Sequence, residues 1–290
     1  MKKRNPNHII LLLVFFTLFV LPSISESNET FSPHQYLIYR LTHDGFDSEF
    51  LSNLLMDARA GLIPRFLTLS LVSKETKELY TKFLNQESLQ LSKKFLHQNL
   101  KILRKAENRF RVEKEIIVAI LLVESRFGEN IGKYRVIPTL ATMALMDFPE
   151  YLQKNYLVLT EKDPGLSYEW VESLARRRAE WAYYQLKCFL NIIRHEKTDP
   201  LEIYGSHAGA LGMAQFIPSS YLTYAQSKEG LGNWLLNKEE AIFSIGNYLN
   251  SHGWKQDLPI EKKRKVLWHY NHSEPYVETV LQVAQKLKNG

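Results

Sequence analysis

The chain of 290 residues contains a single cysteine, Cys188, so no disulfide bond can form within it. Cys188 lies in an apolar stretch with helical spacing, residues 183–190, where a thiol is usually a small buried group rather than a nucleophile. The fold must therefore be held by packing alone. The length allows one large domain or two small ones.

Proline and glycine are absent from residues 65–127, and no alternating strand pattern or internal repeat is found anywhere. The first absence permits long helices. Apolar residues at helical spacing predict helices over residues 75–83, 88–110, 113–127, 138–146, 168–195, 218–227, 238–252 and 274–288. Residues 62–72 read as an apolar loop. The predicted fold class is all-α, with an N-terminal helical extension (26–80) and a catalytic domain (81–290).

The first residues carry an export pattern. Lys2, Lys3 and Arg4 precede an apolar run, residues 9–21, and then Pro22 and a stretch that includes small serines. This order predicts a secretory signal peptide over residues 1–25, because the run is short for a bilayer span. An uncleaved anchor is the alternative. No cysteine lies near the cleavage region, which argues against a lipoprotein. Either reading places the chain outside the cytoplasm, in the periplasm or cell envelope.

The charge balance is basic, with 37 Lys and Arg against 31 Asp and Glu, a net charge of +6. Such a balance suits an anionic partner, either nucleic acid, anionic lipid or bacterial wall. The export pattern argues against nucleic acid. The basic residues are dispersed except at 176–178 and 262–265, and a solvated helix face explains such runs equally well.

One carboxylate follows a long apolar run: residues 116–123 are all apolar and lead directly into Glu124. A helix that is apolar on every side is buried, and desolvation raises the pKa of a carboxyl toward the range of a general acid. Alternatively, Glu124 reaches solvent at the helix end or pairs with Arg126. Glycoside hydrolysis normally requires a second carboxylate, and no Asp or Glu occurs in residues 205–221; if the chain is a glycosidase, a cleavage with one carboxylate is the simpler reading.

Six motifs then resemble, in order, those of the B-type lytic murein transglycosylases. The resemblance covers roughly residues 88–288 and implies a lysozyme-like helical domain with a glycine-rich substrate loop. It also implies that Glu124 acts as acid and then base on the bond between N-acetylmuramic acid and N-acetylglucosamine, forming a 1,6-anhydro ring. The motifs are the helices of residues 96–123, VESRFG at 123–128 with Gly132, RRAEW at 177–181, GSHAGALGMAQFIPSSY at 205–221, the helix at 241–254, and YNHS at 270–273 with Tyr276.

The same resemblance implies the substrate-binding residues. Gln215 offers a donor and an acceptor, Ser206 a hydroxyl that can hold Glu124 or substrate, and Tyr248 a ring for a sugar. The alternatives are a glutamine that caps a helix and aromatic rings that fill the core. The expected partner is the peptidoglycan glycan strand, bound by a monomer without cofactor; association with cell-wall machinery stays open. The expected binding residues are Ser206, Gln215, Tyr248, Tyr270 and Asn271, with Arg177 and Arg178 for the carboxylates of the peptide stem.

Two departures from the family pattern stand out. Residues 147–173 are extra and predict a flap or an added helix at the cleft edge. Many family members carry an acidic calcium loop, but residues 227–234 (SKEGLGNW) lack its oxygen ligands, so no metal is expected. Two rival functions remain, a muramidase-type hydrolase of the same bond and a non-catalytic wall-binding module.

Overall fold

A computed structural model describes residues 31–67, 76–161, 163–194 and 196–289. The predicted signal peptide lies outside the described residues. The all-α fold class is confirmed, and the residues from Ser32 onward form one unit. The described helices are α1 (Pro33–His43), α2 (Ser48–Leu55), α4 (Lys77–Tyr80), α5 (Gln86–Gln98), α6 (Leu100–Phe110), α7 (Lys114–Ser125), α8 (Val136–Ala144), α9 (Pro149–Thr160), α10 (Tyr168–Ile193), α11 (Pro218–Tyr224), α12 (Leu231–Trp234), α13 (Lys238–Ser251), α14 (Ile260–Tyr270) and α15 (Glu274–Lys288), with short 3-10 turns η1 (Ala58–Ala60), η2 (Thr81–Leu84) and η3 (Pro200–Glu202).

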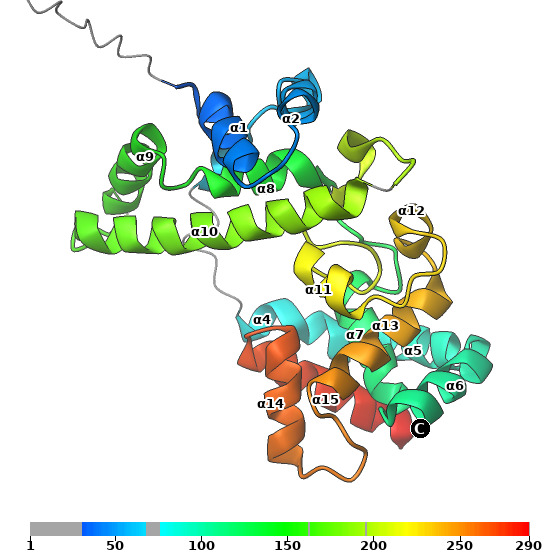
Figure 1. The fold of residues 1–290 in the computed structure, drawn as a ribbon. Coiled ribbons are helices and arrows are strands. Elements are labelled where there is room, and N and C mark those ends of the chain that lie inside the picture. Colours follow the sequence, from blue (N-terminus) through cyan, green and yellow to red (C-terminus); the bar gives the residue numbers. More distant parts are fainter. Residues whose placement is uncertain (1–30, 68–75, 162, 195, 290) are drawn as a thin grey trace, which may run out of the picture. The chain divides into compact units, whose positions relative to one another are not determined.

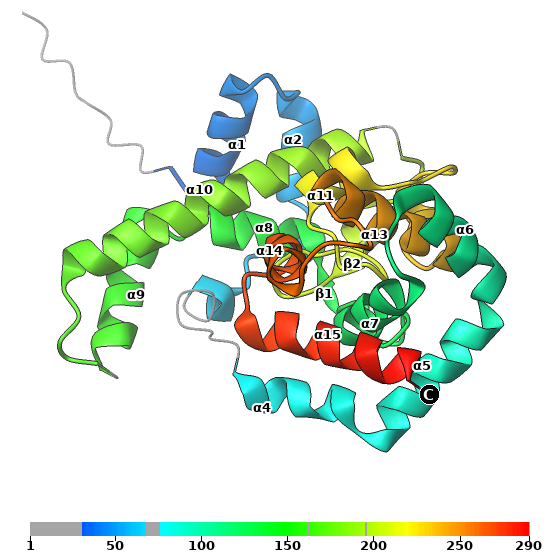
Figure 2. The ribbon, with the colours of Figure 1, turned by 90° about the horizontal axis from the view of Figure 1, so that it is seen from below.

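Helix α7 is the central element of the core. Its residues from Ile116 to Leu122 are all buried, and the 12-residue helix packs against α5, α6, α13 and α15. Figure 2 shows α15 running alongside α7. Each buried leucine or isoleucine side chain stabilises the fold by about 1.5–3 kcal/mol, so this apolar run fixes the helix firmly. Its last residues are thereby held in place.

The N-terminal end of α7 is fastened by a buried carboxylate. Glu113 is 7% exposed, and it accepts hydrogen bonds from Trp254 Nε1 at 2.8 Å and Lys263 Nζ at 2.6 Å. The lysine neutralises the charge of the Glu113 carboxylate, and the indole provides a further hydrogen bond to it. The buried charge is therefore tolerated. Glu113 thus joins α14 and the segment before it to the start of the central helix.

The only strands in the described part of the chain are two residues long. β1 (Tyr134–Arg135) pairs antiparallel with β2 (Tyr204–Gly205), with Tyr134 opposite Gly205. Strands this short have no room for alternation, which is why no strand pattern can be recognised in the sequence. This ribbon connects the segment after α7 to the first residues of the glycine-rich loop.

Several helix boundaries differ from the predictions. The predicted helix over residues 88–110 is two helices, because Asn99 leaves helical geometry and its Nδ2 donates to the carbonyl of Phe95 at 2.8 Å. The helix predicted to reach residue 127 ends at Ser125. Helix α14 was not predicted at all. Its four consecutive basic residues hide the apolar spacing, and only Val266 and Leu267 are buried.

The extra residues 147–173 form a helix and a turn. Helix α9 lies beside the long helix α10 in both views (Figures 1 and 2), and Asp163 accepts a hydrogen bond from the backbone of Gly165 in the turn between them. The N-terminal helices also pack on α10, where Tyr183 Oη and Lys187 Nζ donate to Asp44 at 3.1 and 2.7 Å. The domain division at residue 80 stays a prediction.

Candidate active site

Glu124 is the second-last residue of α7 and is partly buried. The helix stops because Arg126 and Phe127 adopt left-handed backbone angles, with φ of 50° and 61°. Arg126 forms ion pairs with Glu87 and, at 2.8 Å, with Glu129. The cation nearest to Glu124 in the sequence is therefore held by other carboxylates.

Three tyrosines surround the position of Glu124. Burial raises the pKa values of Tyr248, Tyr270 and Tyr276, and the nearby charge of Glu124 raises each of them further. The buried Tyr276 hydroxyl is also coupled to Glu124 by hydrogen bonding, although no partner meets it in regular hydrogen-bond geometry among the described residues. The influence of Glu124 on all three tyrosines places its carboxylate beside their buried rings.

The end of α7 is joined to the glycine-rich loop. Ser125 Oγ donates to the carbonyl of Met213 at 2.7 Å and accepts from the backbone of Gly128 at 3.0 Å. Gly132 has a φ of 101°, and a Cβ there would lie 1.9 Å from the carbonyl oxygen of Gly205. Only glycine permits this approach of two backbones. Helix α7 and the glycine-rich loop are thus built as one unit.

Gln215 in the loop is more constrained than expected. Its φ is 48°, and its Nε2 donates to the carbonyls of Ile131 at 3.1 Å and Gly212 at 2.8 Å. Both amide hydrogens are therefore used within the protein, and the side chain offers only its Oε1 acceptor. The sequence had predicted both a donor and an acceptor.

Ser206 also serves the loop itself. Its hydroxyl oxygen accepts from the backbone of Ala208 at 3.1 Å and of Ala210 at 3.0 Å. A hydroxyl has two lone pairs and one hydrogen. Because both lone pairs of Ser206 are used within the loop, its side chain can act toward a ligand only as a hydrogen-bond donor.

A cavity of about 440 Å³ collects most of the predicted binding residues. Five of them line it: Arg178, Gln215, Tyr248, Tyr270 and Asn271. Glu124, Ser206 and Arg177 are not among its lining residues, but the charge of Glu124 helps to raise the pKa values of two that are, Tyr248 and Tyr270. The lining residues that were not predicted are Trp181, Ala208, Phe216, Ile217, Ser220, His269 and His272.

Two of these residues had a sequence signal that went unused. Trp181 lies in the RRAEW motif one helical turn after Arg178, so it shares a face with that arginine. His269 directly precedes the YNHS motif. Both residues lie in or next to a family motif, but the sequence analysis predicts no binding role for either of them.

Tyr248 is only 6% exposed. Its ring stacks on His252 at 4.2 Å between centroids, and its hydroxyl donates to the carbonyl of His269 at 2.6 Å. Tyr224 and Tyr270 pack edge-on against it, both at 4.8 Å. The ring therefore presents little area to a sugar.

Three consecutive arginines on α10 have three different environments. Arg176 pairs with Glu172 at 3.0 Å, and Arg177 donates to Ser173. Arg178 lines the cavity, and no ion pair of Arg178 is found within the described residues. The helical rotation of about 100° per residue explains why neighbours in sequence face different surroundings.

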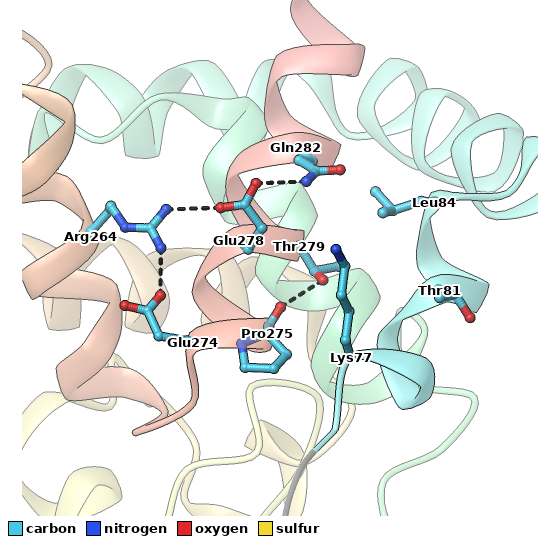
Figure 3. Close-up of a pocket in the computed structure, with 9 residues that line it drawn as sticks. All are labelled: Lys77, Thr81, Leu84, Arg264, Glu274, Pro275, Glu278, Thr279 and Gln282. Atoms are coloured by element: carbon cyan, nitrogen blue, oxygen red, sulfur yellow. Dashed lines mark hydrogen bonds and ion pairs between the residues drawn. The ribbon is translucent and has the colours of Figure 1, made fainter.

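A second, somewhat larger cavity of about 480 Å³ lies between α4–η2 and the helices α14 and α15 (Figure 3). Arg264 bridges Glu274 and Glu278 on its wall. None of the predicted site residues lines it. We therefore place the candidate site in the smaller cavity, where those residues converge.

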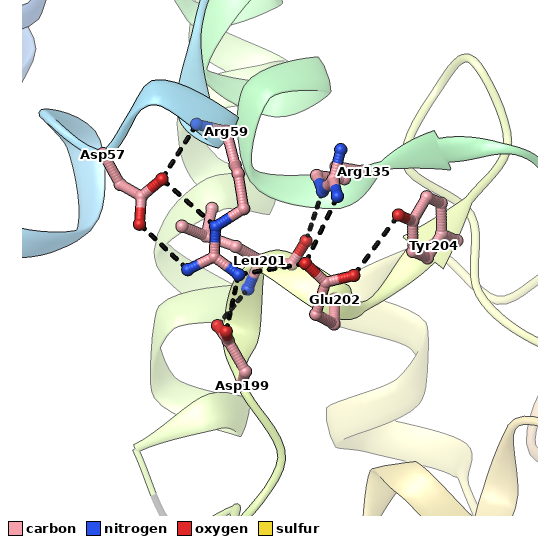
Figure 4. A network of polar contacts seen from close by, with 7 residues as sticks. All are labelled: Asp57, Arg59, Arg135, Asp199, Leu201, Glu202 and Tyr204. Atoms are coloured by element: carbon pink, nitrogen blue, oxygen red, sulfur yellow. Dashed lines mark hydrogen bonds and ion pairs between the residues drawn. The ribbon is translucent and has the colours of Figure 1, made fainter.

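A network of charged residues stabilises the β1–β2 ribbon that leads into the glycine-rich loop (Figure 4). Arg59 binds Asp57, Asp199 and Glu202 at 2.7–2.9 Å, and Arg135 of β1 binds Glu202 and the carbonyl of Leu201. Arg59 hydrogen bonds lower the pKa of Asp57 to about 2. The network connects η1 to the ribbon that leads into the loop.

The described residues contain no cluster of three or more His, Cys, Asp or Glu side chains arranged for a metal. In the segment where calcium was considered, Glu240 Oε1 accepts from the backbone of Lys228 at 3.1 Å. None of the helices that the structure describes is long and apolar enough to cross a bilayer.

The family model described as "Transglycosylase SLT domain" matches residues 33–266, so the chain belongs to the transglycosylase SLT domain family. Membrane-bound lytic murein transglycosylase B of Escherichia coli is 36% identical over 174 residues, which are 60% of this chain. The match spans only 40% of that relative's length.

Solved structures share the fold. Soluble lytic transglycosylase SltB1 of Pseudomonas aeruginosa aligns with a TM-score of 0.70 at 24% identity, over 89% of this chain and 99% of its own. SltB3 of the same organism, in complex with NAG-anhNAM-pentapeptide, aligns with a TM-score of 0.68 at 19% identity, over 89% and 79%. At these identities the likeness concerns the fold alone.

Proposed function

We propose that this chain is a lytic transglycosylase that cleaves the β-1,4 bond between N-acetylmuramic acid and N-acetylglucosamine in peptidoglycan. The observation that carries the proposal is the position of Glu124 beside Tyr248 and Tyr270, which line a cavity whose described lining includes no Asp or Glu. Hydrolysis of a glycosidic bond normally uses a second carboxylate as base or nucleophile. A cleavage that needs one carboxylate fits this site better.

In the proposed reaction Glu124 donates its proton to the glycosidic oxygen as the bond breaks. Its carboxylate then removes the proton from the 6-hydroxyl of the same muramoyl residue. That hydroxyl oxygen attacks the anomeric carbon and closes a 1,6-anhydro ring. The proton taken up returns Glu124 to its starting state, so one residue acts as acid and then as base.

The binding residues would favour ring closure over attack by water. Gln215 Oε1 can accept from an acetamido N–H or a hydroxyl, and Asn271 lies in the same cavity. If these groups hold the muramoyl sugar, its 6-hydroxyl stays beside the anomeric carbon at a very high effective concentration. The described lining of the cavity offers water no carboxylate base.

The names of the relatives support the same reaction, since both SltB1 and the Escherichia coli relative are called lytic transglycosylases. The Pseudomonas SltB3 structure contains a glycopeptide named for its anhydro sugar. We therefore take peptidoglycan strands as the substrate class. With the export pattern of residues 1–25, we place the reaction in the periplasm or cell envelope.

Replacing Glu124 by Gln tests the proposal. The variant keeps the size of the side chain but removes its proton, so cleavage of purified peptidoglycan should fall by at least about 10²-fold. Glu129→Gln is the control, because Glu129 is an exposed carboxylate five residues further on that pairs with Arg126. Near-normal cleavage by a folded Glu124→Gln variant contradicts the assignment. Binding without cleavage by the unaltered chain points to the non-catalytic module instead.

A further inference from the structure

A tryptophan is exposed in the first turn of the long helix α10. Trp170 is the third residue of this helix and belongs to the extra residues 147–173. Its side chain is 49% exposed, and no contact of its indole with another ring or with a cation is found within the described residues. Exposed apolar side chains are common on protein surfaces, so exposure alone gives Trp170 no role.

The helix face on which Trp170 lies leads to the candidate site. Trp181, which lines the cavity, follows Trp170 by eleven residues on the same helix. Because an α-helix turns about 100° per residue, eleven residues make three full turns and only about 20° more. The two indoles therefore start from nearly the same face of α10, roughly 16 Å apart along its axis.

The start of α10 is held firmly, so the position of Trp170 is fixed in advance. The backbone N–H of Trp170 donates to Oγ of Ser167, the N-cap residue, at 3.2 Å. Tyr168 packs edge-on against Tyr156 of α9 at 5.3 Å between ring centroids, and both rings contact the core. A rigid aromatic side chain on a fixed backbone loses little conformational entropy when a ligand covers it.

Two aromatic rings on one face suit a ligand that repeats the same surface along its length. A pyranose ring has a face of C–H groups that packs on the electron-rich face of an indole. A linear glycan offers such a face at each sugar, so a strand that leaves the cavity along α10 meets Trp170 a few sugars beyond Trp181. Figure 1 shows α10 running from α9 past α11, which brings its first turns outside the part of the helix that meets the loop.

We propose that Trp170 forms a distal sugar subsite, in which its indole stacks on a sugar of the glycan strand several sugars away from the bond that is cleaved. The inference rests on the proposed function, because it takes a glycan strand as the ligand. It adds that the chain binds long strands more tightly than short ones. The continuity of the Trp170 face with the Trp181 wall of the cavity favours a glycan over a separate protein or lipid partner.

Calorimetry with oligomers of N-acetylglucosamine tests this subsite on the unaltered chain. These oligomers contain no muramoyl residue, so they lack the bond that the proposed reaction cleaves. They also carry no charge, so the arginines of α10 form no ion pair with them. The hexasaccharide should bind about tenfold more tightly than the disaccharide, because only the longer oligomer reaches from the cavity to Trp170.

Three variants assign the gain to the indole ring. Trp170→Ala should bind the hexasaccharide no more tightly than the disaccharide, with an unchanged affinity for the disaccharide and an unchanged Tm. Trp170→Tyr keeps an aromatic face and should retain part of the gain. Leu157→Ala is the matched control, because Leu157 is another exposed apolar side chain of the extra residues, at 54%, and should bind both oligomers like the unaltered chain.

Equal affinities for the two oligomers, or no binding of either, overturn the subsite, and neither result needs a variant. A gain with length that survives Trp170→Ala overturns it as well, and so does a gain that Leu157→Ala removes equally. None of these results concerns cleavage, so a failure of the subsite is distinct from a failure of the proposed reaction, which product masses decide.

Discussion

The hydroxyl group of Tyr276 is buried beside Glu124, and the charge of that carboxylate helps to raise the tyrosine's pKa well above its usual value. Tyr276 belongs to α15 and Glu124 to α7, two helices that pack along their length. The surroundings of the Glu124 carboxylate thus include a helix from the far end of the chain.

We expect Tyr276→Phe to lower kcat about tenfold and to change KM little, because the hydroxyl contacts Glu124 rather than the cavity. Initial rates on soluble glycan strands measure both constants. Tyr183→Phe is the control, because it removes the hydroxyl of another buried tyrosine, one that donates to Asp44 and does not line the candidate site. An unchanged kcat would show that the Tyr276 hydroxyl has no role in the reaction.

Gly132→Ala should lower the free energy of unfolding by about 2–4 kcal/mol, because a left-handed backbone and a backbone clash act together. Gly45→Ala separates the two effects. Gly45 has a φ of 90°, close to the 101° of Gly132, but a Cβ there meets nothing within 4 Å. It should lower the free energy by about 1–2 kcal/mol. Urea denaturation of both variants gives the comparison, and equal losses would mean that the contact with Gly205 is not tight.

The Arg59 network should contribute its full stabilisation only above about pH 4. The folded pKa of Asp57 is about 2, below its ordinary value of 3.8, so the contribution is present above the ordinary value and is lost as the pH falls toward 2. Arg59→Gln should therefore lower Tm at pH 6 and converge on the unaltered chain near pH 2. Arg176→Gln, which breaks one exposed pair, should lower Tm less. A Tm difference that is independent of pH contradicts this account.

Calcium should leave Tm unchanged. The segment of residues 227–234 has too few oxygen ligands, and Glu240 at its edge already accepts hydrogen bonds from Lys228 and Asn233. Thermal unfolding in chelator and in millimolar calcium is a direct comparison. A reproducible rise of several degrees with calcium would show that a cation binds there.

The sequence predicted those features that depend on local spacing. The apolar run before Glu124 correctly indicated a buried helix, because eight consecutive apolar residues leave no polar face. The glycines at 132 and 205 were recognised by position, and the structure supplies the reason, a contact between two backbones. Helix α14 was missed because its four consecutive basic residues hide the apolar spacing. Two of them, Lys263 and Arg264, pair with Glu113 and Glu278 on other elements, and local spacing does not report such contacts.

The site residues were harder to predict where long-range contacts decide their chemistry. Gln215 lost its donor role because Ile131 and Gly212 take both amide hydrogens, and Tyr248 lost ring area to His252 and two other tyrosines. No periodicity reports such contacts. The different environments of Arg177 and Arg178 also depend on which helix face meets the loop.

The central claim is that the muramoyl 6-hydroxyl, rather than water, attacks the anomeric carbon. Digestion of purified peptidoglycan with the purified chain, followed by mass spectrometry from the earliest time points, tests it directly. The account predicts muropeptides that end in 1,6-anhydro-N-acetylmuramic acid, lighter by one water than muramidase products, because the described cavity lining offers water no carboxylate base. Reducing-end muropeptides as the dominant first products would contradict it and identify the chain as a hydrolase.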